Sequence, residues 1–328
     1  MHDRHSTLAP ARAFLDWPIE TDPRRMAAAL ALIGIPFSEP YAGDEFPNDQ
    51  TRAPAAFRQA LAKFIDAGDH WDFDFDADLA SILPARCIDC GDVQWCDDGY
   101  DVYLRRTSEC LRNLWRGGAQ VLVIGGDHGA TIPALDALDA VGEPVYILHI
   151  DAHLDWREEV GGVTRGYSSP LRWASTKPYI SGMTQIGLRS TGSARRAEVD
   201  AARAYGSQLF TADRYHGEGN AAVLATIPER GSVYITIDAD GMDPTEAPGV
   251  QWPAPGGLLF RQVAPLLREI ARRQRVVGMD VVEIAPRFDA SNGLTSILAG
   301  RLFLNVIGAS WRADGAYGRA KARAPWLS

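Results

Sequence analysis

Acidic and imidazole side chains alternate at the point where a predicted strand ends. The apolar run 145–148 is typical of a buried strand, and it continues into the segment 149–155, His-Ile-Asp-Ala-His-Leu-Asp. Alternate residues of an extended chain project from one face, so Asp151, His153 and Asp155 lie together. Carboxylates crowded at the end of a core strand repel each other and are poorly solvated. A divalent cation resolves this conflict, and a polar strand end that faces water is the alternative interpretation.

The same design recurs later in the chain. A second apolar run, 233–237, continues into Asp238 and Asp240, and a turn signal, Asp243-Pro244, follows. In an open parallel sheet, α/β proteins build their sites at the carboxyl ends of strands. The recurrence therefore favours one shared site over two unrelated polar strand ends.

Two further predicted strands end in side chains that suit such a site. Strand 119–124 is followed by two glycines, an aspartate and His128, and strand 276–282 is followed by Glu283. The candidate metal ligands are then four aspartates and two histidines: His128, Asp151, His153, Asp155, Asp238 and Asp240. One small cation rarely takes so many protein ligands, so two ions that share carboxylates fit better. Mixed histidine and carboxylate ligation without thiolates suits Mn, Fe, Co, Ni or Zn more than Ca or Mg.

Composition excludes several classes of protein. The chain has 328 residues, of which 46% are hydrophobic, and this supports one large α/β domain or two small ones. The net charge of −9 and the lack of a basic run argue against binding to nucleic acid. We expect no signal peptide and no transmembrane helix, because the sequence has no suitable apolar run. We therefore expect a cytoplasmic protein.

Strands and helices are predicted to alternate along the whole chain, which favours a parallel sheet with helices on both faces. We expect an N-terminal arm over residues 1–25 and a single domain over 26–328. Strands are predicted at 29–36, 85–92, 119–124, 145–150, 184–189, 207–210, 232–237 and 275–282. Helices are predicted from residue 53 and at 101–117, 130–140, 193–205, 219–228, 260–273 and 295–310, with long loops at 37–53 and 156–182.

Two weaker motifs are interpreted as structural. Cys87 and Cys90 form a C-x-x-C pair, but Cys96 and Cys110 do not complete a zinc-ribbon spacing, so we favour free thiols in a strand over a zinc or redox site. The segment 72–78 alternates aspartate with aromatic residues. It lacks the glycine and terminal glutamate of a calcium loop, which favours a solvated strand or loop.

The motifs together resemble the ureohydrolase family, which includes arginase, agmatinase and proclavaminate amidinohydrolase. The matching segments are Gly125-Gly-Asp-His128, Asp151-Ala-His-Leu-Asp155, the acidic segment 236–249 and Asp280-Val-Val-Glu283, with further matches at 34–37 and 53–58. The resemblance covers about 30–310 and is nearest to the agmatinase branch. It implies a three-layer α/β sandwich around an eight-stranded parallel sheet, assembled as a homotrimer or homohexamer.

The resemblance also implies roles for individual residues. One metal ion would be held by His128, Asp151, Asp155 and Asp238, and the other by Asp151, His153, Asp238 and Asp240. Asp151 and Asp238 would bridge the two ions, which are manganese in most members and nickel in some. Glu283 matches the acid that receives the substrate guanidinium. The chemistry agrees, because two cations lower the pKa of water enough to supply hydroxide at pH 7.

Arg165 stands where agmatinase-like members have a histidine that is thought to shuttle protons. Arginine cannot exchange a proton near neutral pH, so another group would have to take over, and the candidates are His149, Asp127 and Tyr167. Arg165 could instead bind a substrate carboxylate bidentately. A salt bridge within its own loop, to Glu158 or Glu159, is the structural alternative.

Tryptophans near the predicted site also depart from the agmatinase pattern. Trp156, Arg157 and Trp173 belong to the loop 156–173, and Trp252 belongs to the loop 248–257. Aromatic faces suit a cation or an alkylated guanidine, so Trp252 is a candidate substrate residue. Burial in the core or in an oligomer interface is the alternative. The scattered histidines are predicted to lie at the surface: His2, His5, His70 and His216.

The predicted function is hydrolysis of a guanidino C–N bond in a small guanidino compound, which releases urea or a substituted urea and an amine. Agmatine, 4-guanidinobutyrate, guanidine itself, an N-substituted guanidine or biguanide, and a formimino compound are the candidate substrates. One alternative is a weakly active or scaffolding subunit that assembles with an active paralogue, and the loss of the histidine at Arg165 motivates it. Another is a single-zinc deacetylase on a related fold, in which the pair Asp238 and Asp240 would be surplus.

Overall fold

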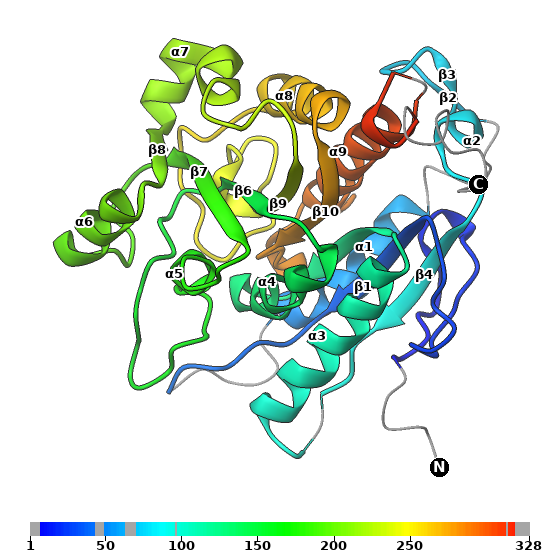
Figure 1. Cartoon of the computed structure of the whole chain (residues 1–328), viewed down its shortest axis with the longest axis horizontal. Helices are drawn as coiled ribbons and strands as arrows, with labels where there is room; N and C mark the ends of the chain where they lie inside the picture. Colours follow the sequence, from blue (N-terminus) through cyan, green and yellow to red (C-terminus); the bar gives the residue numbers. More distant parts are fainter. Residues whose placement is uncertain (1–6, 43–48, 63–69, 96, 313, 319–328) are drawn as a thin grey trace.

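A central sheet of eight parallel strands organises the molecule (Figure 1). The computed structural model describes residues 7–42, 49–62, 70–95, 97–312 and 314–318. The strands lie in the order β4-β1-β5-β10-β9-β6-β7-β8, and every pairing between neighbours is parallel. Their bounds are β1 (Leu30–Ile35), β4 (Cys87–Asp92), β5 (Gln120–Gly125), β6 (Val145–Ile150), β7 (Ile180–Leu188), β8 (Gln208–Thr211), β9 (Ser232–Asp238) and β10 (Arg275–Val282).

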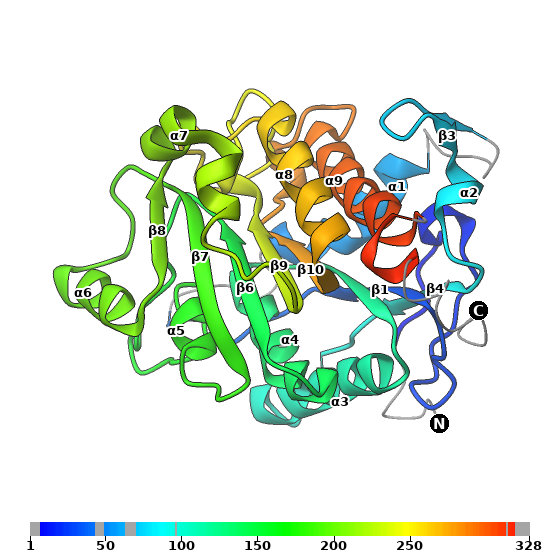
Figure 2. The same cartoon turned by 45° about the horizontal axis from the view of Figure 1, so that its top comes forward.

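Helices cover both faces of this sheet, and Figure 2 shows the resulting three layers. One face carries α1 (Ala53–Leu61), α7 (Ala212–Leu224), α8 (Phe260–Arg273) and α9 (Leu294–Trp311). The other carries α3 (Tyr100–Arg116), α4 (Ile132–Ala137) and α5 (Pro170–Ala174), while α6 (Arg196–Tyr205) lies toward the β8 edge. The predicted three-layer α/β fold with an eight-stranded parallel sheet is confirmed.

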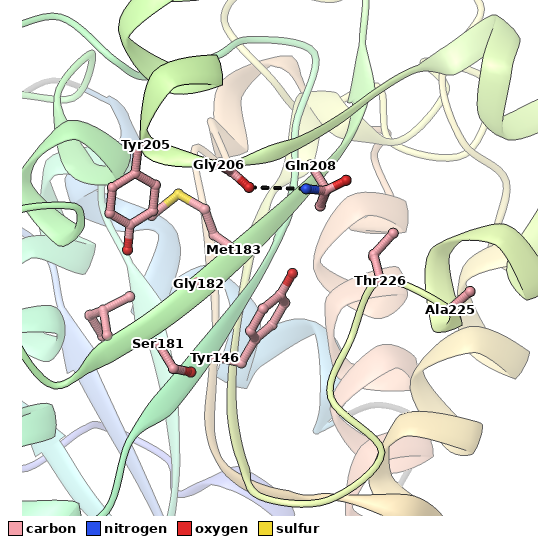
Figure 3. Close-up of a pocket in the computed structure, with 10 residues that line it drawn as sticks. Tyr146, Ser181, Gly182, Met183, Tyr205, Gly206, Gln208, Ala225 and Thr226 are labelled. Atoms are coloured by element: carbon pink, nitrogen blue, oxygen red, sulfur yellow. Dashed lines mark hydrogen bonds between the residues drawn. The ribbon is translucent and has the colours of Figure 1, made fainter.

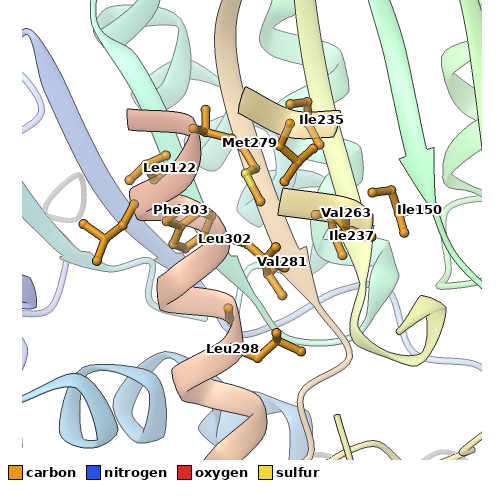
Figure 4. Close-up of a cluster of buried hydrophobic side chains, with 14 of the residues drawn as sticks. Leu122, Ile150, Ile235, Ile237, Val263, Met279, Val281, Leu298, Leu302 and Phe303 are labelled. Atoms are coloured by element: carbon orange, nitrogen blue, oxygen red, sulfur yellow. The ribbon is translucent and has the colours of Figure 1, made fainter. Parts of the chain in front are cut away.

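Each face of the sheet has its own hydrophobic core. On β10, Met279 and Val281 contribute to the core beneath α8 and α9, whereas Val277 contributes to the core on the α3 side. Leu298 and Leu302, four residues apart on α9, pack over Met279 and Val281 (Figure 4). Burial on both faces explains why the strands read as continuous apolar runs.

One helical region is long and apolar enough to cross a membrane when length and composition alone are considered. It is Leu294–Gly318, which includes α9, and 78% of its most apolar window is buried inside the protein. The helix contacts α1, α8 and β10, so its apolar surface faces protein. This is the arrangement of a core helix.

Several boundaries differ from prediction for local reasons. The helix predicted at 219–228 begins earlier, as α7, because the Thr211 side chain accepts a hydrogen bond from the backbone N–H of Arg214 and caps its start. Gly219, with φ of 70°, interrupts that helix at the residue where it was predicted to begin. The loop predicted at 156–182 contains α5, and β7 already begins at Ile180. The helix predicted at 130–140 is α4 flanked by two 3-10 turns, 128–131 and 138–141.

The described part of the predicted N-terminal arm packs closely against β4. Leu8 pairs with Asp92, and Ile19 pairs with Asp89. Phe14 is fully buried and stacks on Phe57 of α1, with 5.3 Å between the ring centroids. The segment therefore contributes to the core, and a domain boundary at residue 26 stays a prediction.

The two weaker motifs have structural environments. Segment 71–78 forms a small antiparallel hairpin, β2 (Trp71–Asp72) and β3 (Ala77–Asp78), which leads into the short helix α2 (Leu79–Ile82). Arg301 forms salt bridges with Asp72 and Asp74, so its guanidinium, and not a calcium ion, pairs with these carboxylates. The described cysteines are free, namely Cys87, Cys90 and Cys110, and Cys96 lies outside the described residues.

Candidate metal centre

The four motifs singled out by the sequence follow four adjacent strands in the middle of the sheet. These strands are β5, β10, β9 and β6, which lie side by side in that order. Val282 is in register with Asp238, and Ile150 is in register with Ile237, so these strands end at one level. The residues at or just beyond their ends, His128, Glu283, Asp238 and Asp151, therefore meet at one edge of the sheet.

A first group of candidate ligands surrounds the ring of His128. Its Nδ1 atom lies 2.8 Å from Oδ2 of Asp155, 3.2 Å from Oδ2 of Asp151 and 3.4 Å from Oδ2 of Asp238. The other ring nitrogen, Nε2, is 3.1 Å from the hydroxyl of Thr236. Although Nδ1 is buried, it makes no hydrogen bond to any residue that the structure describes. An imidazole nitrogen among three carboxylates suits a metal ion.

A second group shares Asp151 with the first. His153 Nδ1 lies 3.1 Å from Oδ2 of Asp240 and 3.4 Å from Oδ1 of Asp151. Asp240 Oδ1 also accepts a hydrogen bond from the backbone N–H of Ala152, which ties the two acidic segments together. His153 is partly exposed, whereas Asp151 and Asp240 are buried. Two groups with Asp151 in common fit a pair of cations.

Electrostatics shows that the cluster needs positive charge. Burial and the charges of Asp240 and Asp151 raise the pKa of Asp238 well above its usual value. Hydrogen bonds to Asp151 and Asp240 raise the pKa of His153 to about 12. Burial acts to lower the pKa of His128, but Asp155 and its other carboxylate neighbours outweigh it and raise that pKa well above normal. The carboxylates are therefore satisfied either by protons on the imidazoles or by divalent cations.

The side chains brought together are those that the sequence predicted, with one addition. His149 also lies among the candidate ligand atoms of the first group, beside Asp151 and Asp155. Asp238 reaches His128 with Oδ2, while its Oδ1 accepts the backbone N–H of Asp240. The distribution of ligands between two ions stays a prediction.

Gly241 allows the acidic segments to approach each other. A Cβ atom at this position would lie 2.7 Å from the backbone nitrogen of Asp151, which no real side chain tolerates. Arg189, at the end of β7, then fixes the turn that carries Asp240. Its guanidinium donates hydrogen bonds to the carbonyl groups of Asp240, Met242 and Ala254. Sequence reasoning missed this role of Arg189.

Glu283 enters the site on a strained backbone. Its φ of 63° is in the left-handed region, which is rare for a residue other than glycine. Oε1 accepts the backbone N–H of His128 at 2.9 Å, and Oε2 accepts Nε2 of Gln50 at 3.0 Å. Burial, together with the charge of Asp127, raises the pKa of Glu283 to about 8. A cationic ligand would favour the ionised carboxylate.

Gln50 is a site residue that sequence reasoning missed. Its Nε2 donates to Glu283 and also to Oε1 of Gln251, at 3.1 Å, and its own Oε1 is buried without a hydrogen bond to any described residue. The residue lies in a 3-10 turn, Asp49–Arg52, held in place because Asp49 accepts the backbone N–H of Arg287. A glutamine in a long predicted loop carries no signal of a partner more than 200 positions away.

Arg165 is held by partners other than those considered from the sequence. Its Nε is 3.2 Å from Oε2 of Glu39, and its NH2 group is 2.7 Å from Oδ1 of Asp101. The guanidinium also lies over the ring of Tyr100, 5.1 Å from the centroid. The alternative, a salt bridge to Glu158 or Glu159, is therefore wrong, because the salt bridges go to other residues. Arg165 joins its loop to the segment before residue 43 and to the start of α3.

The candidates for a proton carrier occupy different environments. His149 is fully buried behind Asp151. Asp127 accepts the backbone N–H of Gly129 and caps the turn that carries His128. Tyr167 packs edge-on against Tyr41, with 4.5 Å between the ring centroids. These positions leave the identity of the carrier a prediction.

The tryptophans divide between the core and the surface. Trp156 is buried against Tyr205, which agrees with the alternative of a core position. Trp173 donates a hydrogen bond from its indole nitrogen to Asp136. Trp252 is 72% exposed and follows Gln251, which accepts a hydrogen bond from Gln50.

The remaining predicted positions are peripheral. Arg157 forms a salt bridge with Glu198. His70 and His216 are exposed, as predicted, whereas His2 and His5 lie outside the described residues.

A separate pocket of about 590 Å³ lies at the opposite edge of the sheet (Figure 3). It is lined by the amino ends of β6 and β7, including Tyr146 and Met183, and by Tyr205 and Gly206 before β8. The length of β6 separates it from Asp151. It is thus not part of the candidate metal centre.

Comparisons with known proteins agree with the geometry of the site. The family model described as Arginase family matches residues 28–308. Proclavaminate amidinohydrolase from Streptomyces clavuligerus is 31% identical over 283 residues, which are 85% of this chain and 87% of that protein. Agmatinase from Sodalis glossinidius is 28% identical over 308 residues, 92% of this chain and 94% of that protein.

Solved structures have the same fold. The structure of proclavaminate amidinohydrolase from Streptomyces clavuligerus matches with a TM-score of 0.78 and 29% identity, over 94% of this chain and 98% of that one. A hypothetical agmatinase from Burkholderia thailandensis matches with a TM-score of 0.75 and 23% identity, over 98% of this chain and 97% of that one. The likeness therefore extends to the complete fold and is not confined to a local motif.

Removal of single carboxylates should separate shared ligands from unshared ones. We expect Asp151→Asn and Asp238→Asn to lose both metal ions, because each is predicted to bridge them, whereas Asp155→Asn should keep one. Elemental analysis of the purified variants after gel filtration measures this directly. Asp213→Asn, on the exposed side of α7, controls for the loss of one charge. Equal and complete metal loss in the three site variants would contradict the bridging assignment.

Proposed function

The chain belongs to the arginase family, and from this premise we propose that it is a dinuclear-metal amidinohydrolase. It uses water to cleave a guanidino C–N bond in a small substrate and releases urea, or a substituted urea, and an amine. It is thus a hydrolase that acts on the C–N bonds of linear amidines.

The observation that carries this proposal is the position of Glu283 relative to the two ligand groups. Its carboxylate is one backbone hydrogen bond from His128, whose ring faces Asp151 and Asp155. A buried carboxylate beside a metal-binding cluster can hold a planar guanidinium and present its central carbon to water. A structural carboxylate would have no need of such a strained and buried position.

The cations and Glu283 have separate roles in the proposed hydrolysis. When two divalent cations are bound, they supply a hydroxide nucleophile at neutral pH. Glu283 receives the guanidinium, because each of its oxygens accepts one protein hydrogen bond and keeps a lone pair for the substrate. Pairing in this buried setting is stronger than it would be in water. After water adds to the guanidino carbon, the C–N bond breaks and the amine leaves with a proton.

The cations are manganese, with nickel as the alternative. The nitrogen ligands His128 and His153 support transition metals over magnesium or calcium. The subunits form a homotrimer or homohexamer, as the resemblance to the family implies. A scaffolding subunit is not favoured, because the chain keeps every predicted ligand: His128, Asp151, His153, Asp155, Asp238 and Asp240.

Charge near the site supports a substrate without a carboxylate. Arg165 is already paired with Glu39 and Asp101, so a substrate carboxylate would have to displace one of them. Trp252 is exposed beside Gln251, and its aromatic face suits a cationic or alkylated group. Agmatine and N-substituted guanidines therefore rank ahead of 4-guanidinobutyrate as substrates.

A urea-release screen over guanidino compounds, run with Mn and with Ni, tests the proposal. We expect release of urea or a substituted urea from at least one cationic guanidino compound. Glu283→Gln should raise KM and lower kcat while both metals stay bound, since it weakens the grip on the guanidinium without removing a ligand. Elemental analysis distinguishes the two effects. If this variant loses metal, Glu283 is a ligand and its assigned role is wrong.

Gln50→Leu should weaken substrate recognition without releasing metal. The variant removes a hydrogen bond to a charged carboxylate, which is worth about 1.5–3 kcal/mol, so we expect kcat/KM to fall by about 10- to 100-fold. Gln208→Leu, at an exposed position at the start of β8, is the matched control. Unchanged kinetics in Gln50→Leu would show that Glu283 is held well enough by the His128 N–H alone.

Arg165→His should not raise the turnover of agmatine. The change restores the residue found in agmatinase-like members, but it also breaks the contacts with Glu39 and Asp101. We expect agmatine hydrolysis to stay level or fall, and hydrolysis of the best substrate found in the urea-release screen to fall. Steady-state kinetics with agmatine and with that substrate measures this. A clear increase with agmatine would instead point to an ordinary agmatinase with a damaged proton shuttle.

A further inference from the structure

A chain of hydrogen bonds runs from Ser207, immediately before β8, to Asp151. The Ser207 hydroxyl donates to Oε1 of Gln185 at 2.9 Å. Nε2 of Gln185 contacts Nδ1 of His149 at 3.0 Å, and Nε2 of His149 lies 2.8 Å from Oδ2 of Asp151. His149, Gln185 and Asp151 are fully buried. Water therefore does not compete for these bonds.

The surroundings of Gln185 fix which way its amide points. Its Nε2 also donates to the backbone carbonyl of Leu154 at 2.9 Å, and a carbonyl can only accept. If the amide were reversed, its oxygen would face that carbonyl, and its NH2 group would face Ser207. The oxygen therefore faces Ser207, and an N–H group faces His149.

The orientation of the amide in turn fixes the tautomer of His149. Because Gln185 donates to Nδ1, that ring nitrogen carries a lone pair, and the proton of the neutral ring is on Nε2. Nε2 then donates to Asp151 and has no lone pair for a metal ion. His149 lies among the candidate ligand atoms, but its chemistry is that of a donor.

We infer that His149 is a positioning residue that holds the Asp151 carboxylate for two metal ions, and that Gln185 and Ser207 lock it in this role. The inference rests on the proposed function, in which Asp151 is shared by both ions. Oδ2 of Asp151 accepts from His149, and Oδ1 accepts from the backbone N–H of His153. With one donor on each oxygen, the carboxylate cannot rotate, and its remaining lone pairs face the two ligand groups.

The sheet holds His149, Gln185 and Ser207 in fixed positions. His149 on β6 is in register with Gln185 on β7, and Ser207 immediately precedes β8. Two adjacent parallel strands and the residue before a third thus each contribute one member. Sites built on such elements are more precise than sites on loops, and partners of metal ligands affect metal affinity by about 10- to 100-fold.

Measurements of metal affinity test the positioning role of His149 without any substrate. The dissociation constant for Mn and for Ni is measured in the full-length protein by competition with a chelator, and bound metal is counted at saturation. His149→Phe keeps a ring but removes the donor, and we expect its affinity to fall by about 10- to 100-fold with the count unchanged. His149→Gln places an amide N–H near the position of Nε2 and should restore most of the affinity.

The supporting residues and a control make the test selective. Gln185→Met should weaken metal binding as His149→Phe does, and Ser207→Ala should do so to a smaller degree. Tyr146→Phe is the matched control, since it removes one buried hydrogen bond, to Thr184, from the other end of β6. ¹⁵N NMR of the histidine rings should show His149 as the Nε2–H tautomer in the wild type.

Each contrary outcome has a distinct meaning. If His149→Gln binds one metal ion fewer at saturation, His149 is a ligand and the inference fails. It also fails if His149→Phe, or both Gln185→Met and Ser207→Ala, keep the affinity of the wild type. Since no substrate is present, a wild-type chain that releases no urea would contradict the proposed function and leave these expectations unchanged.

Discussion

The carboxylate of Asp151 is the contact on which the candidate site depends. It lies within 3.4 Å of imidazole nitrogens from both ligand groups and is fully buried. Burial acts to raise the pKa of Asp151, but contacts with His149, His128 and His153 outweigh it and hold that pKa well below normal. A charged carboxylate in the interior is costly unless it is paired. The rest of the edge provides this pairing, and two shared cations would complete it.

The order of the strands determines how the candidate ligands meet. Ligand-bearing segments that are far apart in the sequence become neighbours because β5, β10, β9 and β6 are adjacent and parallel. Backbone hydrogen bonds fix the level at which each strand ends, so each side chain starts from a rigid point. The turns beyond the strands are then held by single residues, such as Arg189 and Gly241, which act on the backbone and not on the ligands.

This division explains what the sequence could and could not reveal. Apolar runs and strand-ending acids predicted the sheet and the ligand cluster, because both signals are local. Gln50, Gln185 and Arg189 escaped notice, since an amide or a guanidinium gains its role only from a distant partner. Arg165 was recognised as unusual, but its partners Glu39 and Asp101 come from other segments and could not be read from its own loop. The early start of α7 similarly followed from a cap, which apolar spacing does not reveal.

Backbone strain also occurs at the site. Asp155 and Glu283 both adopt positive φ, at 49° and 63°, although neither is a glycine. Such conformations cost on the order of 1–3 kcal/mol each and persist only where the surroundings fix them. Glu283 directly follows β10, whereas Asp155 lies in the loop beyond β6, and both carboxylates contact His128. The protein thus gives up stability at two positions where a carboxylate is placed beside His128. This pattern is expected where the placement of charge, and not the packing of the fold, determines the local conformation.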